Sequence, residues 1–190
     1  SNNIFLNEKL LARVKSIYDK KEQLNLSTED AKLLEDLYES FKANGATVNK
    51  DDKEKYRKLS MDLSMLTLQF DQNALKDKNR FELLITDENE LSGLPESARD
   101  AAAMLAKSKD KNGWLFNLSA PSYIPFMRYS DKRDLREKMY REYMSVGNKG
   151  DEFDNKDIIK KIVNIRLEIA QLMGFKNYAE YALEHTMAKN

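Results

Sequence analysis

The chain contains no cysteine and only one histidine, His185. The absence of cysteine excludes a disulfide framework, thiolate catalysis and any zinc or iron site held by cysteine. One histidine is too few for a catalytic zinc site, which needs two imidazoles on one helix face and a third ligand. We therefore expect no catalytic residue and no metal ligand in this chain. His185 is interpreted as a helix-end or solvent-facing residue.

Glycine and proline are scarce, with 6 and 3 of 190 residues. This supplies too few turns for a sandwich or barrel of many short strands. No apolar run is long enough to span a bilayer, so a membrane partner is not expected. The first residues, SNNIFLNEKL, also lack the basic and then apolar order of a signal peptide.

The chain has no excess of either charge, with 32 Lys and Arg against 32 Asp and Glu. Because these charges are interspersed along helix faces, no basic patch for nucleic acid is predicted. Hydrophobic residues make up 41% and charged residues 34%, which indicates one core with a strongly solvated exterior. We expect a soluble protein, with the cytoplasm favoured over the periplasm, although a chain without cysteine is stable in either redox environment.

The clearest helical signal lies in residues 154–181. Asp154 or Asn155 offers an N-cap, Gly174 is typical of a C′ glycine, and Asn177 begins a shorter helix. A stripe of apolar residues spaced by three and four marks one face. Its members are Ile158, Ile162, Ile165, Ile169 and Leu172. A second stripe beside it predicts that the helix is packed on two sides. Its members are Ile159, Val163, Ala170 and Met173.

Three helical segments are predicted before residue 80. They are Asn3–Leu24, a helix from Ser27 to the Asn44-Gly45 breaker pair, and the longest element, from Asn49 to about Asp77. The third has an apolar seam like that of a coiled coil. The seam consists of Tyr56, Leu59, Leu63, Leu66, Phe70 and Ala74. Met61, Met65 and Leu68 form a second stripe, interpreted as core filling against neighbours on two sides.

The period changes to that of strands at two places. Phe81–Thr86 and residues 114–118 are strand candidates, separated by a helix over Glu96–Lys107 with Pro95 at its first position. The two strands pair either as a small ribbon or as a β-α-β unit. This is the only β structure that we expect.

The remaining segments complete a mainly α fold, a multi-helix bundle with a two-stranded β element near residues 81–86 and 114–118. Pro121 and Pro125 bracket a short helix or turn that leads to a cap at Ser130. A charged helix follows over Asp131–Val146. We expect a single helical region over residues 1–190, with a helical hairpin and long helix at 1–80, a small α/β insertion at 81–119 and a helical bundle at 120–190.

Three blocks of the sequence carry a family resemblance. They are ITDENELSGLPESA (85–98), APSYIPFMRYSDKRDLREKMYREY (120–143) and IRLEIAQLMGFKNYAEYALEHTMAKN (165–190). In the same order and at similar spacing, they resemble segments of the M3 family of zinc metallopeptidases, the group of peptidyl-dipeptidase, oligopeptidase A and thimet oligopeptidase. In that family such segments lie in the helical N-terminal half, before the metal site.

The resemblance implies what the complete protein does. Family members hydrolyse oligopeptides in a channel between two mostly helical halves, where an HExxH helix and a downstream Glu hold zinc and the motif's Glu activates the bound water. This chain lacks that motif, so by resemblance it is a piece that continues beyond Asn190 and forms one wall of the channel. Its expected partners are short peptide substrates and the missing C-terminal catalytic half. Alone it is expected to be inactive and to bind no zinc.

Tyr123, Arg128 and Tyr129 are the best candidates for contact with a substrate in the channel. An arginine pairs with a peptide carboxylate and a tyrosine donates to a backbone carbonyl. The alternative is that both tyrosines cap the core while Arg128 pairs with a nearby acid.

A second function remains open, a stand-alone helical module that binds partner helices in a groove and catalyses nothing. The two hypotheses differ in a measurable property. A channel wall separated from its other half exposes apolar surface and binds hydrophobic dyes, whereas a natural module does not.

Overall fold

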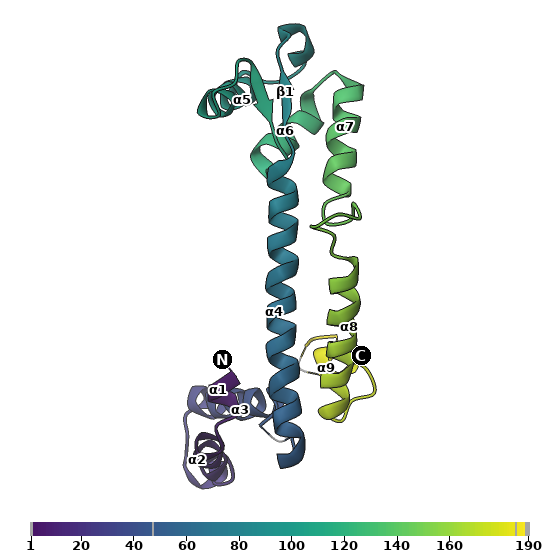
Figure 1. Ribbon diagram of the computed structural model, residues 1–190. Helices are drawn as coiled ribbons and strands as arrows, with labels where there is room; N and C mark the ends of the chain where they lie inside the picture. Colours follow the sequence, from purple (N-terminus) through teal and green to yellow (C-terminus); the bar gives the residue numbers. More distant parts are fainter. Residues whose placement is uncertain (1, 47, 185, 189–190) are drawn as a thin grey trace. The chain divides into compact units, whose positions relative to one another are not determined.

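The computed structural model of the chain describes residues 2–46, 48–184 and 186–188. As predicted, this part is mainly α-helical and holds one small two-stranded sheet (Figure 1). It divides into two compact units, unit 1 with residues 1–66 and 161–190 and unit 2 with residues 67–160. Within the described residues, no helix combines the length and the apolar content needed to cross a bilayer. His185 lies outside the described residues, so its predicted position is not tested.

The first helical segment of unit 1 is divided, so the prediction of one helix over Asn3–Leu24 is wrong. It forms α1 (Asn2–Phe5), α2 (Glu8–Tyr18) and a 3₁₀ turn, η1 (Lys21–Gln23). The break has a local cause, because the Asn7 side chain accepts hydrogen bonds from the backbone N–H groups of Lys9 and Leu10 and so starts a new helix. The next helix, α3 (Thr28–Ala43), is capped by Ser27 as predicted.

The longest element is α4 (Lys50–Arg80), which begins one residue and ends three residues later than predicted. Tyr56 and Leu59 of its apolar seam are buried, at 6% and 9% exposure. The second stripe is not buried: Met61, Met65 and Leu68 are 57%, 59% and 58% exposed. The prediction that the described chain itself packs this helix on two sides is therefore wrong.

The helix predicted around residue 165 is α8 (Lys156–Leu172), followed by α9 (Tyr178–Leu183). Ile158 and Ile169 of its first stripe are buried, at 7% and 4% exposure. Its second stripe is divided, because Ala170 is buried whereas Ile159 and Val163 are 47% and 57% exposed. The predicted ends are confirmed: Gly174 has φ +88°, and the Asn177 side chain caps α9.

Unit 1 has two hydrophobic clusters. One joins α4 and α8 with the segments beside them, through Leu6, Val48, Tyr56, Leu59 and Ile169. The other joins α2 and α3 through Val14, Phe41 and Ala46. Tyr181 contributes a hydrogen bond, because its hydroxyl donates to the carbonyl of Ala43 at 2.6 Å, at the end of α3. This contact satisfies a terminal helix carbonyl.

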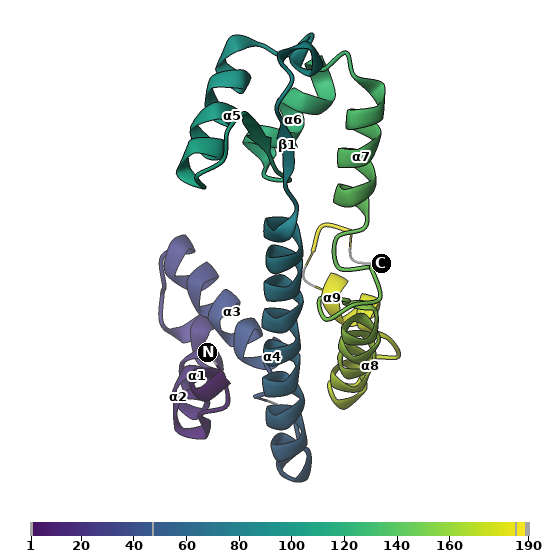
Figure 2. The ribbon, with the colours of Figure 1, turned by 45° about the horizontal axis from the view of Figure 1, so that its top comes forward.

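In unit 2 the sheet consists of β1 (Leu83–Ile85) and β2 (Trp114–Phe116). The strands are antiparallel, with Leu83 opposite Phe116 and Ile85 opposite Trp114, so the ribbon is formed and the β-α-β alternative is wrong. A short 3₁₀ turn, η2 (Glu88–Leu91), and α5 (Glu96–Ser108) connect them. Pro95 is the N-cap of α5, not its first residue. Figure 2 shows α5 and α6 beside the ribbon.

The segment with two prolines forms a regular helix, α6 (Ala120–Tyr129), with Pro125 inside it. The following helix is α7 (Arg133–Met144), shorter than predicted. Ser130 ends α6 and does not cap α7, although its hydroxyl accepts from the backbone N–H of Lys132 at 3.2 Å. Gly93, in the turn before α5, has φ +83°, and a Cβ there would lie 2.1 Å from the Tyr129 carbonyl oxygen. That turn therefore packs directly on the end of α6.

The core of unit 2 lies between the ribbon and α5, α6 and α7. Its members are at most 4% exposed. They are Leu83, Ile85, Leu91, Leu94, Ala102, Phe116, Leu118, Phe126 and Met139. The rings of Phe116 and Phe126 meet edge to face at 4.8 Å. This core fixes α6, the helix that carries the residues predicted to contact substrate.

Candidate functional site

The structure separates the three predicted site residues by their surroundings. Tyr123 is half-buried, packs against the core of unit 2 and stacks on Tyr143 with ring centroids 4.3 Å apart. Burial is the main cause of the raised pKa of the Tyr123 phenol, and the nearby Tyr143 and Tyr140 raise that pKa further. Tyr123 is therefore a neutral packing residue whose ring positions α6 from the inside.

Arg128 and Tyr129 lie at the exposed end of α6. The Arg128 guanidinium is 5.9 Å from the centroid of the Tyr129 ring, and Tyr129 is 47% exposed. Within the described residues, no acid pairs with Arg128. Core packing thus explains Tyr123 alone. The other two residues form an exposed pair of a cation and an aromatic ring, able to meet a carboxylate and an apolar side chain.

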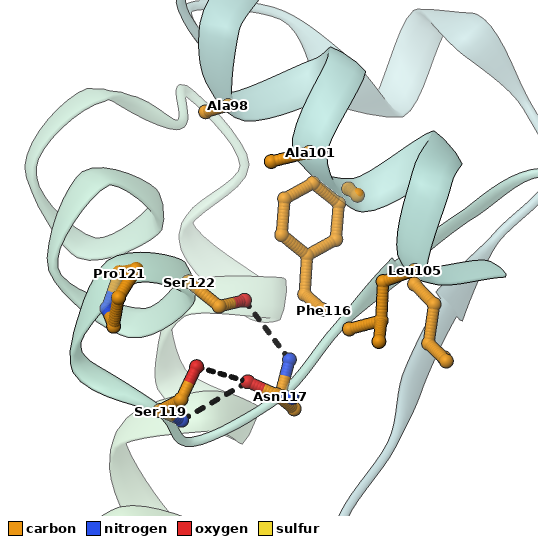
Figure 3. A pocket seen from close by; sticks show the side chains of 10 residues that line it. Ala98, Ala101, Leu105, Phe116, Asn117, Ser119, Pro121 and Ser122 are labelled. Atoms are coloured by element: carbon orange, nitrogen blue, oxygen red, sulfur yellow. Dashed lines mark hydrogen bonds between the residues drawn. The ribbon is translucent and has the colours of Figure 1, made fainter. Parts of the chain in front are cut away.

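A pocket that the sequence analysis missed lies at the other end of α6 (Figure 3). It has a volume of about 140 Å³. Its apolar part comes from α5 and β2 and includes Ala98, Ala101, Leu105 and Phe116. Its polar edge consists of Asn117 and Ser119, which precede α6, and Ser122 in the first turn of α6. The sequence signal for this edge is Asn117 two residues before Ser119, a pattern typical of a turn in which a side chain accepts from the backbone.

The polar groups of this pocket are already paired with one another. The Asn117 side-chain oxygen accepts from the backbone N–H of Ser119 at 3.0 Å and from its hydroxyl at 2.6 Å. The Ser122 hydroxyl accepts from the backbone N–H of Asn117 at 3.0 Å. In the surroundings that the structure describes, neither serine has a histidine base, so the arrangement suits binding of a small apolar group and not nucleophilic catalysis.

A second polar cluster, here called the polar hub, lies in unit 2 where α4 meets the loop before α8. Its centre is Asp77, whose side chain is fully buried. It accepts from the Gly147 backbone N–H at 2.7 Å, from Arg80 Nε at 2.7 Å and from Lys149 Nζ at 3.2 Å. Since the Asp77 charge is paired on all sides, the polar hub holds the loop in place and has no free group for chemistry.

Neighbouring groups extend the polar hub. Lys149 also contacts Glu142 at 2.6 Å, and although burial lowers the Lys149 pKa, hydrogen bonds to Glu142 and Asp77 raise it overall. Arg80 donates to Asp151 and thereby lowers the pKa of that carboxyl. Asn155 donates to the Phe70 carbonyl and accepts from Asn73, each at 3.1 Å. Asn155 is therefore a tie between segments, whereas the Asp154 side chain accepts from the backbone N–H of Lys156 at the start of α8.

A metal site is not formed by the described residues, which contain no group of three or more His, Cys, Asp or Glu arranged to hold an ion. The paired carboxylates of the polar hub are already satisfied by cations and backbone N–H groups. By themselves, the described residues therefore do not fit a catalytic zinc ion.

Comparison with known proteins identifies the relatives of this chain. The model of peptidase family M3 matches residues 126–190. Oligopeptidase A of Salmonella typhimurium is 38% identical over 169 residues, which are 87% of this chain and 25% of that protein. Dipeptidyl carboxypeptidase of Escherichia coli is 33% identical over 190 residues, which are 100% of this chain and 28% of that protein. The chain belongs to peptidase family M3.

Membership of family M3 confirms the resemblance seen in the three sequence blocks. A probable cytosolic oligopeptidase A of Arabidopsis thaliana, 38% identical over 92% of this chain, is a further relative. The chain spans about a quarter of the length of the curated relatives that it matches. Within family M3, the described residues thus correspond to a mainly helical part.

Proposed function

We propose that this chain is the non-catalytic N-terminal region of a zinc-dependent oligopeptidase or peptidyl-dipeptidase, and that it forms one wall of the channel that admits short peptides. Relatives named oligopeptidase A and dipeptidyl carboxypeptidase support the reaction, hydrolysis of peptide bonds. We place the metal ligands in the remainder of the protein, and this is supported by the lack, among the described residues, of three or more His, Cys, Asp or Glu grouped to hold an ion. The role of this chain is to limit access and to exclude water when the channel closes.

The observation that carries this proposal is the exposed apolar surface of the two long helices. Met61 and Met65 of α4 are 57% and 59% exposed, and Val163 of α8 is 57% exposed. Met61 and Met65 are four residues apart, as are the exposed Ile159 and Val163, which is the pattern of a helix face that is covered by another element. We propose the C-terminal catalytic half as the element that covers them.

A direct test is to sequence the source gene in frame beyond Asn190. We expect an HExxH motif within an apolar helix, followed by a helix that carries the third zinc ligand. A stop codon at or near Asn190 would contradict the proposal and favour the stand-alone interaction module. The alternative also predicts a different surface, since a natural module binds no hydrophobic dye, whereas a separated wall does.

Arg128 and Tyr129 remain the proposed contacts to peptide, with Tyr123 as the residue that supports α6. In the longer protein, Arg128→Ala should raise KM for short peptides with a free carboxylate, because a charge-assisted hydrogen bond to substrate is lost. Arg57→Ala is the matched control, since Arg57 is exposed on α4 and its contact to Glu54 is a weak 3.8 Å. Unchanged kinetics for Arg128→Ala would remove Arg128 from the channel.

We further propose a cytoplasmic location in preference to a periplasmic one. The name of the Arabidopsis thaliana cytosolic relative supports this assignment. Recovery of the native protein in the periplasmic fraction of its source cell would contradict it.

A further inference from the structure

A groove of about 400 Å³ lies on unit 2, lined by one residue of α6 and five of α7. These residues are Met127, Arg133, Arg136, Glu137, Tyr140 and Arg141. The five from α7 are spaced by three and four, so they share one face of that helix. The inward face of α7 is occupied separately, because Met139 is fully buried in the core and Leu135 packs against it. The groove is therefore an outer surface of unit 2.

The charges of this groove, here called the arginine groove, are not balanced. Three guanidinium groups face one carboxylate, and that carboxylate, Glu137, is bound to Arg141 at 2.7 Å. Arg136 donates to the Ser130 carbonyl, which holds its side chain in place. Among the described residues, Arg133 and the Tyr140 hydroxyl have no hydrogen-bond or ionic partner. Two groups that donate to anions thus remain available beside a fixed third.

Two of these arginines lie at the end of α7 where negative charge is favoured, and one acid, Asp134, shares that turn with them. Arg133 and Arg136 lie in the first turn of the helix. The helix dipole places partial positive charge at this end, where acidic side chains or bound anions are stabilising and cations are not. A negatively charged ligand in the groove adds to the compensation that Asp134 gives to these cations and uses the unpaired donors at the same time.

We propose that the arginine groove binds a peptide through a carboxylate. The flat guanidinium of Arg133 receives the two oxygens, the Tyr140 hydroxyl donates to one of them, and Met127 offers an apolar contact for the neighbouring peptide side chain. The choice of a peptide as the bearer of the carboxylate rests on the proposed function. The positive charge and the free donors of the groove are observations independent of it.

The test is fluorescence anisotropy of a labelled hexapeptide of glutamate with an amidated end, titrated with the 190-residue chain at low salt. Arg133→Gln should weaken binding roughly three- to tenfold, as expected for loss of one charge-assisted hydrogen bond. Glu137→Gln should strengthen binding, because it releases Arg141 from its internal partner. Arg57→Gln on α4 is the matched control and should change nothing, and hexalysine should not bind.

Two variants with opposite expected signs separate a ligand role from a structural one, since loss of folding weakens binding in both. Unchanged affinity in Arg133→Gln and Glu137→Gln, with circular dichroism like that of the parent chain, would overturn the proposal. Tyr140→Phe gives a second check and should weaken binding by a smaller factor.

Further arms identify the carboxylate and its bearer. A neutral hexapeptide with a free carboxyl end that binds as well as hexaglutamate assigns the groove to the peptide terminus, and preference for hexaglutamate assigns it to acidic side chains. Inorganic phosphate that competes better than acetate at equal ionic strength would overturn the peptide assignment. Peptide hydrolysis by the longer protein is measured separately, so failure of the groove and failure of the proposed function are distinguishable.

Discussion

The two units differ in how completely their cores are closed. The nine core residues of unit 2 are at most 4% exposed, and six large side chains among them, including Phe116 and Phe126, are at most 1% exposed. The main cluster of unit 1 is 4–9% exposed, and a separate small cluster joins α2 and α3. Since stability follows the apolar area removed from water, unit 2 is expected to be stable by its own side chains. Unit 1 is expected to gain less stability from its own side chains.

The largest expected effect tests the closed core of unit 2. Phe126→Ala removes a fully buried ring that packs on Phe116, and should lower the free energy of unfolding by about 3–5 kcal/mol. Urea unfolding is followed by the fluorescence of Trp114, the only tryptophan, which packs against this core. Ile169→Ala in unit 1 is the comparison and should leave the Trp114 transition in place. Equal shifts in both variants would mean that the units unfold together.

The next effect concerns the polar hub. Among the described residues, unit 1 contains no comparable cluster of buried polar side chains. Asp77→Asn keeps the shape of the side chain but removes the charge that binds Arg80, Lys149 and the Gly147 N–H. We expect a loss of about 2–3 kcal/mol in the same unfolding experiment, because hydrogen bonds to a buried charged group are among the strongest. Asp71→Asn, at an exposed position of the same helix, should change stability by less than about 0.5 kcal/mol. A similar loss in both variants would contradict the role of the hub.

A smaller effect tests the closure of unit 1. Tyr181→Phe removes the hydrogen bond to the Ala43 carbonyl and should cost about 1 kcal/mol, measured by circular dichroism. Burial raises the pKa of Tyr181, so the folded state holds the phenol proton more tightly than the unfolded state. The stability from this proton is fully present below pH about 10, the usual tyrosine value, and is lost as pH rises through the folded pKa.

The alkaline loss should therefore be smaller in Tyr181→Phe than in the parent chain. It should not vanish, because burial also raises the pKa of Tyr56 in the same cluster. Tyr140→Phe, whose ring is 50% exposed, is the control. An identical alkaline profile for Tyr181→Phe and the parent would show that the Tyr181 phenol does not contribute.

The smallest effect in this chain is expected at the exposed stripe of α4. Met65→Lys should change stability by less than about 0.5 kcal/mol, because the side chain is 59% exposed, and it should reduce the binding of a hydrophobic dye. Gln69→Lys introduces the same group at an exposed polar position and should leave dye binding unchanged. In the longer protein Met65→Lys should be clearly destabilising. A lack of any effect there would contradict the proposed covering of this face.

Several elements were predictable because their signals are local. The cap at Ser27, the glycine end at Gly174 and the cap at Asn177 each use contacts within four residues. The single helix predicted over Asn3–Leu24 is wrong because the Asn7 side chain caps a new helix at a point where the apolar periodicity continues. The antiparallel pairing of β1 and β2 was not predictable from the pattern, since two short apolar runs fit either direction.

The polar hub and the arginine groove depend on contacts far apart in sequence or on shape. A signal for the hub was present, because continuing the seam of α4 by alternate steps of three and four past Phe70 leads to Asn73 and Asp77. Polar residues on a buried seam indicate a specific partner, but that the partner of Asp77 is the loop at Gly147 is visible only in the structure. The second stripes of α4 and α8 were predicted to be buried, but most of their residues are exposed. The apolar pattern alone does not show whether another part of the described chain covers a stripe.

The turn at Gly93 limits which amino acids the chain tolerates at this position. With φ +83° and the Tyr129 carbonyl oxygen 2.1 Å from the place of a side-chain carbon, the position excludes every other amino acid on two separate grounds. In a library of random substitutions selected for folded protein, only glycine should therefore be retained at position 93, while the neighbouring Ser92 tolerates replacement more readily. The position of the end of α6, which carries Arg128 and Tyr129, would then be preserved during evolution by a residue that has no side chain.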